Sequence, residues 1–371
     1  MNKVEQYRRL DAVNYSFLKK VIKGTADADS PDDSLALSIG SLVDCRITTP
    51  ELFNSMFTVI DKIPGDKPKK IVDRIFKDFE ENPDAVTGLR ALDEDYLTHL
   101  INEYEYWGGI KDNKEGDREN KLTKLINDGA VIDYYAEKLL ALNKGMKIVD
   151  GGMVELSDRI AQSIKTGEFT SVFFYPPPGI KIHYQVIITF SVSGVQCKGL
   201  IDVLLENTTD DPIWIGNYLI PGKHVLPIDL KTTAYGPMWF EPIMRKYRYD
   251  MQGSFYKHGL SQWIAYNKPE YKVADFMFIV ESSKYPGKPL VWVLSQFDEL
   301  VGRWGGSKDT AGNFIPGIND VDPDYAADMY TLDVLGFEQA IQLYKWHKER
   351  DLWDYPRYIY EANGLLTTNQ Y

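Results

Sequence analysis

KGLIDVLLE at residues 198–206 and PIDLKTT at residues 227–233 are the two stretches that decide the fold. Each is a run of apolar residues interrupted by an aspartate, which predicts a β-strand. Apolar residues also alternate with a period of two over 182–190 and 195–201, and Ser193-Gly194 between them is a typical hairpin turn. The long connection from 207 to 224 is interpreted as an extended hairpin, and two later strands are expected over 271–282 and 289–296.

The chain changes character near residue 170. Helical periodicity dominates up to about residue 165, and strands follow, with further helices expected over 243–266 and 324–350. We therefore predict an α/β (α+β) fold. Residues 1–165 would form a mostly helical N-terminal region that contributes to the site. Residues 166–371 would form a mixed central sheet flanked by helices and closed by a C-terminal helix, and the two parts would make one compact unit.

Composition excludes several classes of protein. The 371 residues carry a formal charge of −12, which argues against a protein that coats nucleic acid or an anionic membrane but leaves room for a local basic groove. Two cysteines, Cys45 and Cys197, are too few for a disulfide framework or a cysteine-rich metal cluster. The sequence has neither a signal-like segment nor an 18-residue apolar run, so we expect a soluble cytoplasmic protein without a membrane partner.

Candidate catalytic residues lie in the two deciding stretches. Asp229 and Lys231 share one face of a strand because side chains two apart point the same way. If the strand of Asp202 is adjacent, two carboxylates and one ammonium group converge, which suits Mg²⁺-dependent phosphodiester hydrolysis. A solvated surface pair is the alternative interpretation of Asp-x-Lys. The apolar neighbours of both aspartates favour a site, since an unpaired buried charge is costly.

The helix expected after the second deciding stretch carries basic, amide and aromatic residues. Arg245, Arg248, Gln252 and Tyr256 are spaced by three and four residues, so they would share one helical face. Such a face could contact a phosphate backbone and a terminal base. In the alternative interpretation, the two arginines are ordinary solvated charges and Tyr256 belongs to the core.

Five short motifs in a fixed order resemble one known family, the PDDEXK nucleases of the RecB type, and most of all their RecE (exodeoxyribonuclease VIII) branch. In chain order the motifs are Asn14-Tyr15-Ser16-Phe17-Leu18-Lys19, Gly40-Ser41-Leu42-Val43-Asp44, Gly199-x-x-Asp202, Asp229-x-Lys231-Thr232-Thr233 and Gln252-x-x-x-Tyr256. The resemblance spans residues 14 to about 296. One departure is Asp44, which stands where the family has a metal-binding histidine.

The resemblance implies a restriction-endonuclease-like core and a Mg²⁺-dependent exonuclease acting on ends of linear duplex DNA, with Mn²⁺ as a substitute metal. Asp202 and Asp229 would bind metal, with Asp44 as an auxiliary ligand, and Lys231 would position the attacking water. The DNA would be held by Gln252, Tyr256, Arg248 and Arg245. Phage recombination or DNA end processing in a bacterial cytoplasm, a single-strand annealing recombinase as partner and a homo-oligomeric state would accompany this activity.

Two other functions stay open from the sequence. The first is a catalytically impaired relative that binds DNA ends or a recombinase, with Asp44 as the mark of a decayed site. The second is a metal-dependent hydrolase of small phosphoesters. Binding of Mg²⁺ or Mn²⁺ that depends on Asp202 separates the active nuclease from the decayed one, and turnover of a nucleotide-sized ester without cleavage of DNA identifies the hydrolase.

Overall fold

The computed structural model describes residues 3–24, 35–60, 62–79, 87–106, 115–309, 311, 313–317 and 332–365, with the backbone alone for 35–37 and 115–119. The chain forms two compact units, one of Met1–Thr48 with Arg159–Tyr371 and one of Thr49–Asp158. This division differs from the expected single unit with a boundary at 165/166. Helical periodicity is present on both sides of residue 49, so it could not reveal that residues 49–158 are an insertion with a core of their own.

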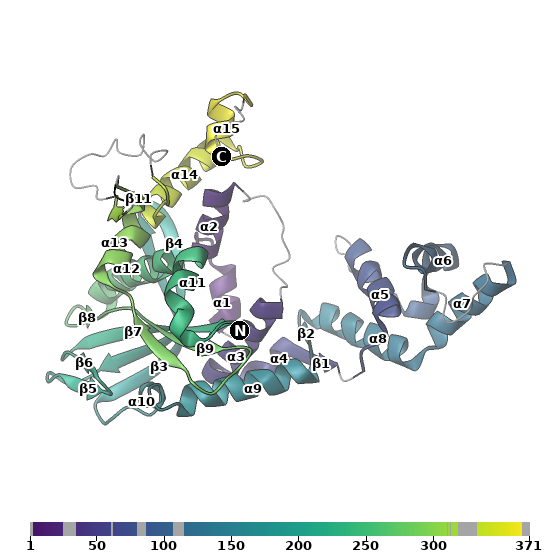
Figure 1. Ribbon diagram of the computed structural model, residues 1–371, viewed down its shortest axis with the longest axis horizontal. Helices are drawn as coiled ribbons and strands as arrows, with labels where there is room; N and C mark the ends of the chain where they lie inside the picture. Colours follow the sequence, from purple (N-terminus) through teal and green to yellow (C-terminus); the bar gives the residue numbers. More distant parts are fainter. Residues whose placement is uncertain are drawn as a thin grey trace. The chain divides into compact units, whose positions relative to one another are not determined.

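A mixed sheet forms the centre of the larger unit (Figure 1), in the strand order β10-β9-β7-β4-β3, with β8 paired to β7. Helices pack on this sheet, so the predicted fold class is confirmed. The strands are β3 (Ile180–Val192), β4 (Val195–Asn207), β7 (His224–Thr233), β8 (Lys272–Val273), β9 (Met277–Ser282) and β10 (Leu290–Val293). Strands β7 and β9 run parallel, whereas the pairs β3/β4, β4/β7 and β9/β10 are antiparallel.

The predicted hairpin fixes the register of the sheet. Ser193 and Gly194 both have positive φ, 49° and 81°, as a two-residue primed turn requires, and Val192 pairs with Val195 across it. The long connection between β4 and β7 contains the short hairpin of β5 (Ile213–Ile215) and β6 (Tyr218–Ile220), so its interpretation as an extended hairpin is also confirmed.

Helix α12 (Tyr249–Asn267) packs along β3 and β4 and closes the main core (Figure 1). Phe255 lies edge-on to Phe190 of β3 at a centroid distance of 4.8 Å, and Phe276 and Phe278 are fully buried nearby. Gly259 allows the close approach, because a Cβ there would lie 2.3 Å from the Phe190 ring. β9 is buried along its whole length, which explains its continuous apolar run.

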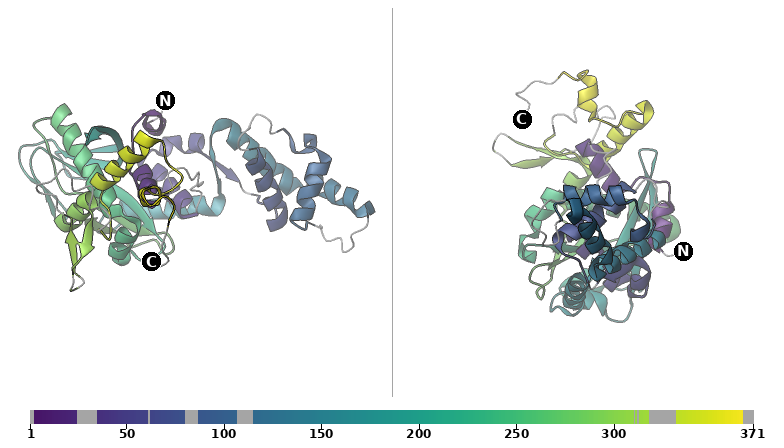
Figure 2. Two further views of the ribbon diagram at one scale, coloured as in Figure 1. Left: turned by 90° about the horizontal axis from the view of Figure 1, so that it is seen from above. Right: turned by 90° about the vertical axis from the view of Figure 1, so that its right-hand side faces the viewer.

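The other helices among the described residues of this unit are α1 (Lys3–Arg9), α2 (Tyr15–Lys23), α3 (Leu35–Thr48), the later part of α9 (Gly151–Thr166), α10 (Ser171–Phe174), η4 (Pro237–Trp239), α11 (Phe240–Tyr247), α13 (Gln296–Trp304), α14 (Phe337–Arg350) and α15 (Arg357–Glu361). The helix expected over 324–350 is α14, which begins only at Phe337, and residues 324–331 lie outside the described part of the chain. Helix α14 packs against α2 (Figure 2). The short strands β11 (Gly306–Lys308) and β12 (Phe314–Pro316) pair with each other. None of the helices among the described residues has the length and apolar character needed to cross a bilayer.

The inserted unit is helical around a separate core that includes Ile71, Leu97 and Tyr135. It contains η1 (Pro50–Leu52), α4 (Phe53–Met56), β1 (Phe57–Ile60), α5 (Asp66–Asp78), η3 (Leu89–Ala91), α6 (Glu94–Glu103), α7 (Glu115–Asn127), α8 (Gly129–Lys144), β2 (Lys147–Asp150) and the start of α9 (Gly151–Thr166). Strands β1 and β2 pair in parallel. The unit has 15 Lys and Arg against 23 Asp and Glu, so it carries −8 of the net charge of −12.

Candidate functional site

An acidic cluster forms where β4 and β7 separate. Their ladder ends at the pair Val203 and Ile228, and Asp202 is the next residue of β4. One oxygen of the Asp202 carboxylate accepts a hydrogen bond of 2.8 Å from the Leu230 amide of β7. The Asp202 carboxylate therefore accepts a hydrogen bond that a backbone carbonyl would accept if the strands stayed paired. Its second oxygen remains available as a ligand.

Asp229 and Lys231 face the same gap from β7. The ammonium group of Lys231 forms an ion pair with the Asp229 carboxylate, and both side chains are largely buried. The other Asp229 oxygen accepts a hydrogen bond of 2.9 Å from the amide of Gln252 on α12. Lys231 also lies 4.6 Å from the centroid of the Tyr249 ring, so an aromatic face covers its other side.

Asp44, near the end of α3, is the third carboxylate. The amide nitrogen of Gln185 donates to both Asp44 oxygens, at 2.9 and 3.0 Å, and to the Thr48 hydroxyl at 3.1 Å. The Thr48 hydroxyl donates in turn to the Asp44 backbone carbonyl. Two side chains, Gln185 of β3 and Thr48 one turn further along α3, therefore fix the orientation of this carboxylate.

Sequence reasoning missed Gln185. Its side chain is buried although it occupies a polar position of the alternating strand β3, and its φ of 51° is rare for a residue with a Cβ. The signal that could have found it is the turn at Ser193-Gly194, because the register it imposes places Gln185 directly opposite Asp202. Strand pairing is interrupted at that point, between Tyr184/Val203 and Val186/Ile201.

Burial raises the pKa of all three carboxyl groups, and repulsion from a neighbouring carboxylate adds to it at Asp44 and Asp202. For Asp44, burial and then the charge of Asp229 raise the pKa to about 7, against lowering by hydrogen bonds from Thr48 and Gln185. Burial, together with Asp229 and Asp44, raises the pKa of Asp202 well above its usual value. Burial also raises the pKa of Asp229, although Lys231 opposes it. Burial acts to lower the pKa of Lys231, but the combined attraction of Asp229, Tyr249 and Asp202 outweighs it, so the pKa is raised.

The donor set fits a hard divalent cation. Carboxylate oxygens are the ligands that Mg²⁺ prefers, and one or two of them suffice when water completes the shell. Across the described parts of the chain no three His, Cys, Asp or Glu side chains enclose a single point as a ready metal cage. The residues that fit such a cation are therefore Asp202 and Asp229, whose buried carboxylates repel each other. Asp44 lies close enough to raise the pKa of Asp202 further.

The raised pKa of Asp44 predicts how stability depends on pH in the absence of metal. The folded state holds a proton on Asp44 up to about pH 7, whereas the unfolded chain releases it near the ordinary value of 3.8. The folded state therefore binds more protons in this range. The unfolding free energy contributed by Asp44 should fall as pH rises from about 4 to 7, by at most about 1.4 kcal/mol per pH unit.

Urea unfolding in EDTA at pH 5, 6, 7 and 8 measures this effect. The unfolding free energy of Asp44→Asn should rise relative to that of the wild type as the pH increases to 7. Above pH 7 the difference between the two should stay constant. The control Asp210→Asn alters a carboxylate whose side chain is 93% exposed and should show no such trend. Parallel pH curves for wild type and Asp44→Asn would show that Asp44 ionises normally.

Gln252 and Tyr256 of α12 both reach the acidic cluster. Gln252 does so through its hydrogen bond to Asp229. Tyr256 is nearly buried and packs against Gly199 of β4, where a Cβ would lie 3.2 Å from the tyrosine ring. Burial raises the pKa of Tyr256 well above its usual value, so its hydroxyl stays protonated. The glycine and the tyrosine of two separate sequence motifs thus form one packing contact beside Asp202.

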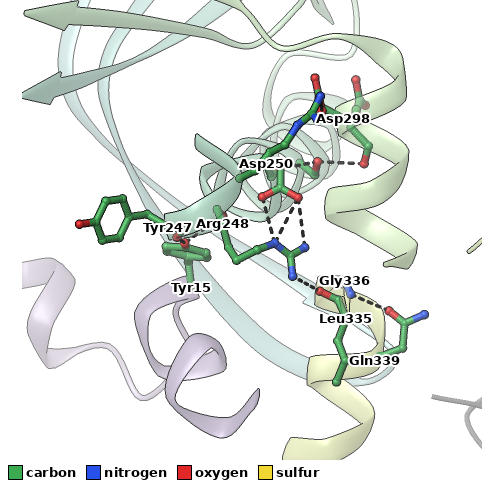
Figure 3. Close-up of polar contacts among 11 residues, drawn as sticks. Tyr15, Tyr247, Arg248, Asp250, Asp298, Leu335, Gly336 and Gln339 are labelled. Carbon is green, nitrogen blue, oxygen red and sulfur yellow. Dashed lines mark hydrogen bonds and ion pairs between the residues drawn. The ribbon is translucent and has the colours of Figure 1, made fainter. Parts of the chain in front are cut away.

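Arg245 and Arg248 do not share a face with Gln252 and Tyr256, and the prediction of one helix over 243–266 is wrong. The chain leaves the helical conformation at Arg248, whose φ of 61° separates α11 from α12. The Arg248 guanidinium group binds the buried Asp250 carboxylate and the Leu335 carbonyl, at 3.1 and 2.6 Å (Figure 3). Arg248 therefore joins α12 to the segment before α14. Arg245 is exposed and pairs with Glu241 at 2.8 Å.

The joint at Arg248 is also held from the N-terminal side. The Tyr15 hydroxyl lies 2.9 Å from the carbonyl oxygens of both Tyr247 and Arg248 (Figure 3). The Arg248 carbonyl also accepts a hydrogen bond of 3.2 Å from the Gln252 backbone amide of α12. The resemblance motif that contains Tyr15 thus stabilises the start of α12. A cavity of about 950 Å³ lies elsewhere, lined by residues that include Phe17, Tyr344 and Trp353, and none of the acidic cluster lines it.

Comparisons with known proteins do not assign the chain to a family. Neither a protein-family model nor a curated protein matches it. The chain resembles a crystal structure described as a "putative exonuclease" from Eubacterium rectale, with 14% sequence identity and a TM-score of 0.29. The match covers 85% of this chain and 96% of the other. At this TM-score the likeness does not establish a common fold.

Proposed function

We propose that the protein is a Mg²⁺-dependent DNA exonuclease of the PDDEXK type that hydrolyses linear double-stranded DNA. The observation that carries the proposal is the cluster of Asp202, Asp229 and Lys231 at the separation of β4 and β7. Burying carboxylates beside one another costs stability, and such arrangements are typical of functional sites. The order of sequence motifs that resemble the RecE branch, two of which contain these residues, gives further support.

Each residue of the cluster has a distinct task in this proposal. Asp202 and Asp229 would hold Mg²⁺, which Mn²⁺ could replace, with Asp44 as an auxiliary ligand. The bound metal would polarise the phosphate and lower the pKa of a water molecule. Lys231 would hold the attacking water or neutralise the charge that develops on the phosphate. Gln252 fixes the Asp229 carboxylate, and Tyr256 supports the strand that carries Asp202.

The negative charge of the chain is compatible with a DNA substrate because it lies mostly outside the unit that contains the cluster. That unit has a net charge of −4, and its segments 25–34 and 317–328 hold four Asp each and no Lys or Arg. The rest of the unit therefore carries +4. A local positive excess attracts phosphate even when the whole chain is acidic.

The proposal is tested with the full-length protein and three substrates. These are an end-labelled linear duplex, a covalently closed circle of the same sequence, and bis(p-nitrophenyl) phosphate, each in Mg²⁺ or in EDTA. We expect progressive loss of the linear duplex in Mg²⁺, an intact circle, and no cleavage in EDTA. Cleavage that persists in EDTA would contradict the metal requirement. Turnover of the small ester alone would identify the small-phosphoester hydrolase instead.

A further inference from the structure

Five large side chains, four of them aromatic, stand exposed around the ends of two central strands. They are Tyr235, Met238, Trp239, Tyr247 and Tyr285, here named the aromatic edge. Tyr235, Met238 and Trp239 are exposed by 67, 76 and 68%, and Tyr285 by 73%. Isolated exposed rings are common on protein surfaces, but a group of them beside a catalytic strand indicates a binding surface.

Strand topology brings these residues to one edge of the sheet. β7 and β9 run parallel, and their last residues, Thr233 and Ser282, are paired. The carboxyl ends of the two strands therefore meet, and the loops that follow them, 234–239 and 283–289, are neighbours. Tyr235 lies in the first loop, and its backbone amide donates to the Thr233 hydroxyl. Tyr285 lies in the second loop, and its backbone amide donates to the Ser282 hydroxyl.

The loop after β7 is anchored although its side chains are exposed. The Trp292 indole of β10 donates to the Pro237 carbonyl at 3.0 Å, and Phe240, the residue after the loop, is buried in the core. Trp239 packs over Gly236, where a Cβ would lie 3.7 Å from the indole. The exposed rings are thus presented by a fixed backbone, which lowers the entropy lost on binding.

A row of stacked rings connects the aromatic edge to Lys231. The Lys231 ammonium group lies over Tyr249, whose ring is stacked with Tyr247 at 5.8 Å and with Phe240 at 6.0 Å. Figure 3 shows the Tyr247 ring pointing away from the Arg248 and Asp250 pair. Tyr235 is four residues beyond Lys231, within about 14 Å along the chain. That distance corresponds to roughly four rises of stacked bases.

Exposed lysines accompany these rings. Lys246 lies 5.5 Å from the centroid of Tyr247, and Lys284 lies 5.3 Å from that of Tyr285. Ring faces that alternate with ammonium groups are the combination that binds single-stranded nucleic acid, because bases stack on the rings and phosphates pair with the cations. Bases within a duplex already stack on their neighbours, so free ring faces require unpaired bases.

We propose that the aromatic edge binds the unpaired bases of a single-stranded DNA end next to the acidic cluster. The inference rests on the proposed nuclease function and specifies its substrate: a duplex with a single-stranded or frayed end, held by base stacking within a few nucleotides of the phosphate that is hydrolysed. Binding through stacking is tolerant of base sequence, so we expect little sequence preference at the edge.

Binding of fluorescein-labelled dT₂₀, followed by anisotropy in EDTA so that no cleavage occurs, tests this inference. Trp239→Ala and Tyr235→Ala should each weaken binding roughly 5- to 100-fold. Tyr266→Ala is the matched control. Tyr266 is 88% exposed on α12, but it lies about 21 Å along the helix from Gln252, so its loss should leave binding unchanged.

The outcomes separate the inference from the function on which it rests. If the wild type binds dT₂₀ through Trp239 but never cleaves DNA, the inference stands and the proposed nuclease function fails. If the wild type cleaves DNA while Trp239→Ala binds dT₂₀ as the wild type does, the inference fails and the nuclease function stands. Unchanged dT₂₀ binding with an altered oligomeric state of Trp239→Ala on size exclusion would overturn the inference and assign the edge to a protein partner.

Discussion

Asp229→Asn is expected to slow Mg²⁺-dependent cleavage of linear duplex DNA roughly 10³-fold, or about 4 kcal/mol in the activation free energy. Asparagine keeps the shape of the side chain and an acceptor for the Gln252 amide, which lies 2.9 Å from Asp229. It removes the charge that would hold the metal and pair with Lys231. The rate is measured with the end-labelled duplex at saturating Mg²⁺.

The control for this substitution is Asp210→Asn, which makes the same chemical change at an exposed loop position. Its cleavage rate should equal that of the wild type. Far-ultraviolet circular dichroism and urea unfolding show whether Asp229→Asn retains the fold. A folded Asp229→Asn that cleaves DNA at the wild-type rate would remove Asp229 from the site.

Lys231→Met is expected to slow the same reaction roughly 10²- to 10³-fold while leaving metal binding intact. Methionine replaces most of the aliphatic stem and removes the ammonium group that would position water or stabilise the developing charge. Because the substitution also relieves the ion pair with Asp229, the carboxylate becomes freer to bind a cation. Single-turnover cleavage at several Mg²⁺ concentrations separates the loss of rate from any change in metal affinity.

Lys272→Met provides the control, since Lys272 is exposed on β8 and is not part of the acidic cluster. We expect full activity for this variant. If Lys231→Met regains the wild-type rate merely by raising the Mg²⁺ concentration, the lysine acts on metal affinity and not on the chemical step.

Local sequence patterns were sufficient to predict the hairpin and the strand that carry the cluster, although the pairing of β4 with β7 was only a condition of the site. Ser193 and Gly194 are residue types suited to a tight turn, and the turn fixes the pairing of β3 with β4 without further information. Asp229 and Lys231 share a face through the strand period alone. These features depend on neighbours in the chain, which is why they can be predicted from one sequence.

Features that depend on distant contacts could not be predicted in this way. The break at Arg248 has no glycine or asparagine to indicate a left-handed residue, and it is stabilised by Tyr15, Asp250 and Leu335, two of which are far away in the chain. The inserted unit is defined by its own core and not by a change in composition. For Gln185, the register of the turn indicates its place opposite Asp202, but its contact with Asp44 depends on the approach of α3 and could not be predicted.

The electrostatics of the cluster indicate that these residues serve a function and do not stabilise the fold. Raised pKa values at Asp44, Asp202 and Asp229 show that the folded protein disfavours their charged forms. Among the groups that shift the pKa values of these three carboxyl groups, Lys231 is the one cation. A divalent cation would remove the repulsion, so its binding should release protons and stabilise the unit.

The central claim is that the acidic cluster at the separation of β4 and β7 binds a divalent metal for phosphodiester hydrolysis. Isothermal titration of Mn²⁺ into metal-free wild type, Asp229→Asn and Lys231→Met tests it most directly, because it needs no knowledge of the substrate. We predict saturable binding to the wild type and to Lys231→Met, and its loss in Asp229→Asn. Equal binding to the wild type and Asp229→Asn, or no binding to the wild type, would contradict the claim.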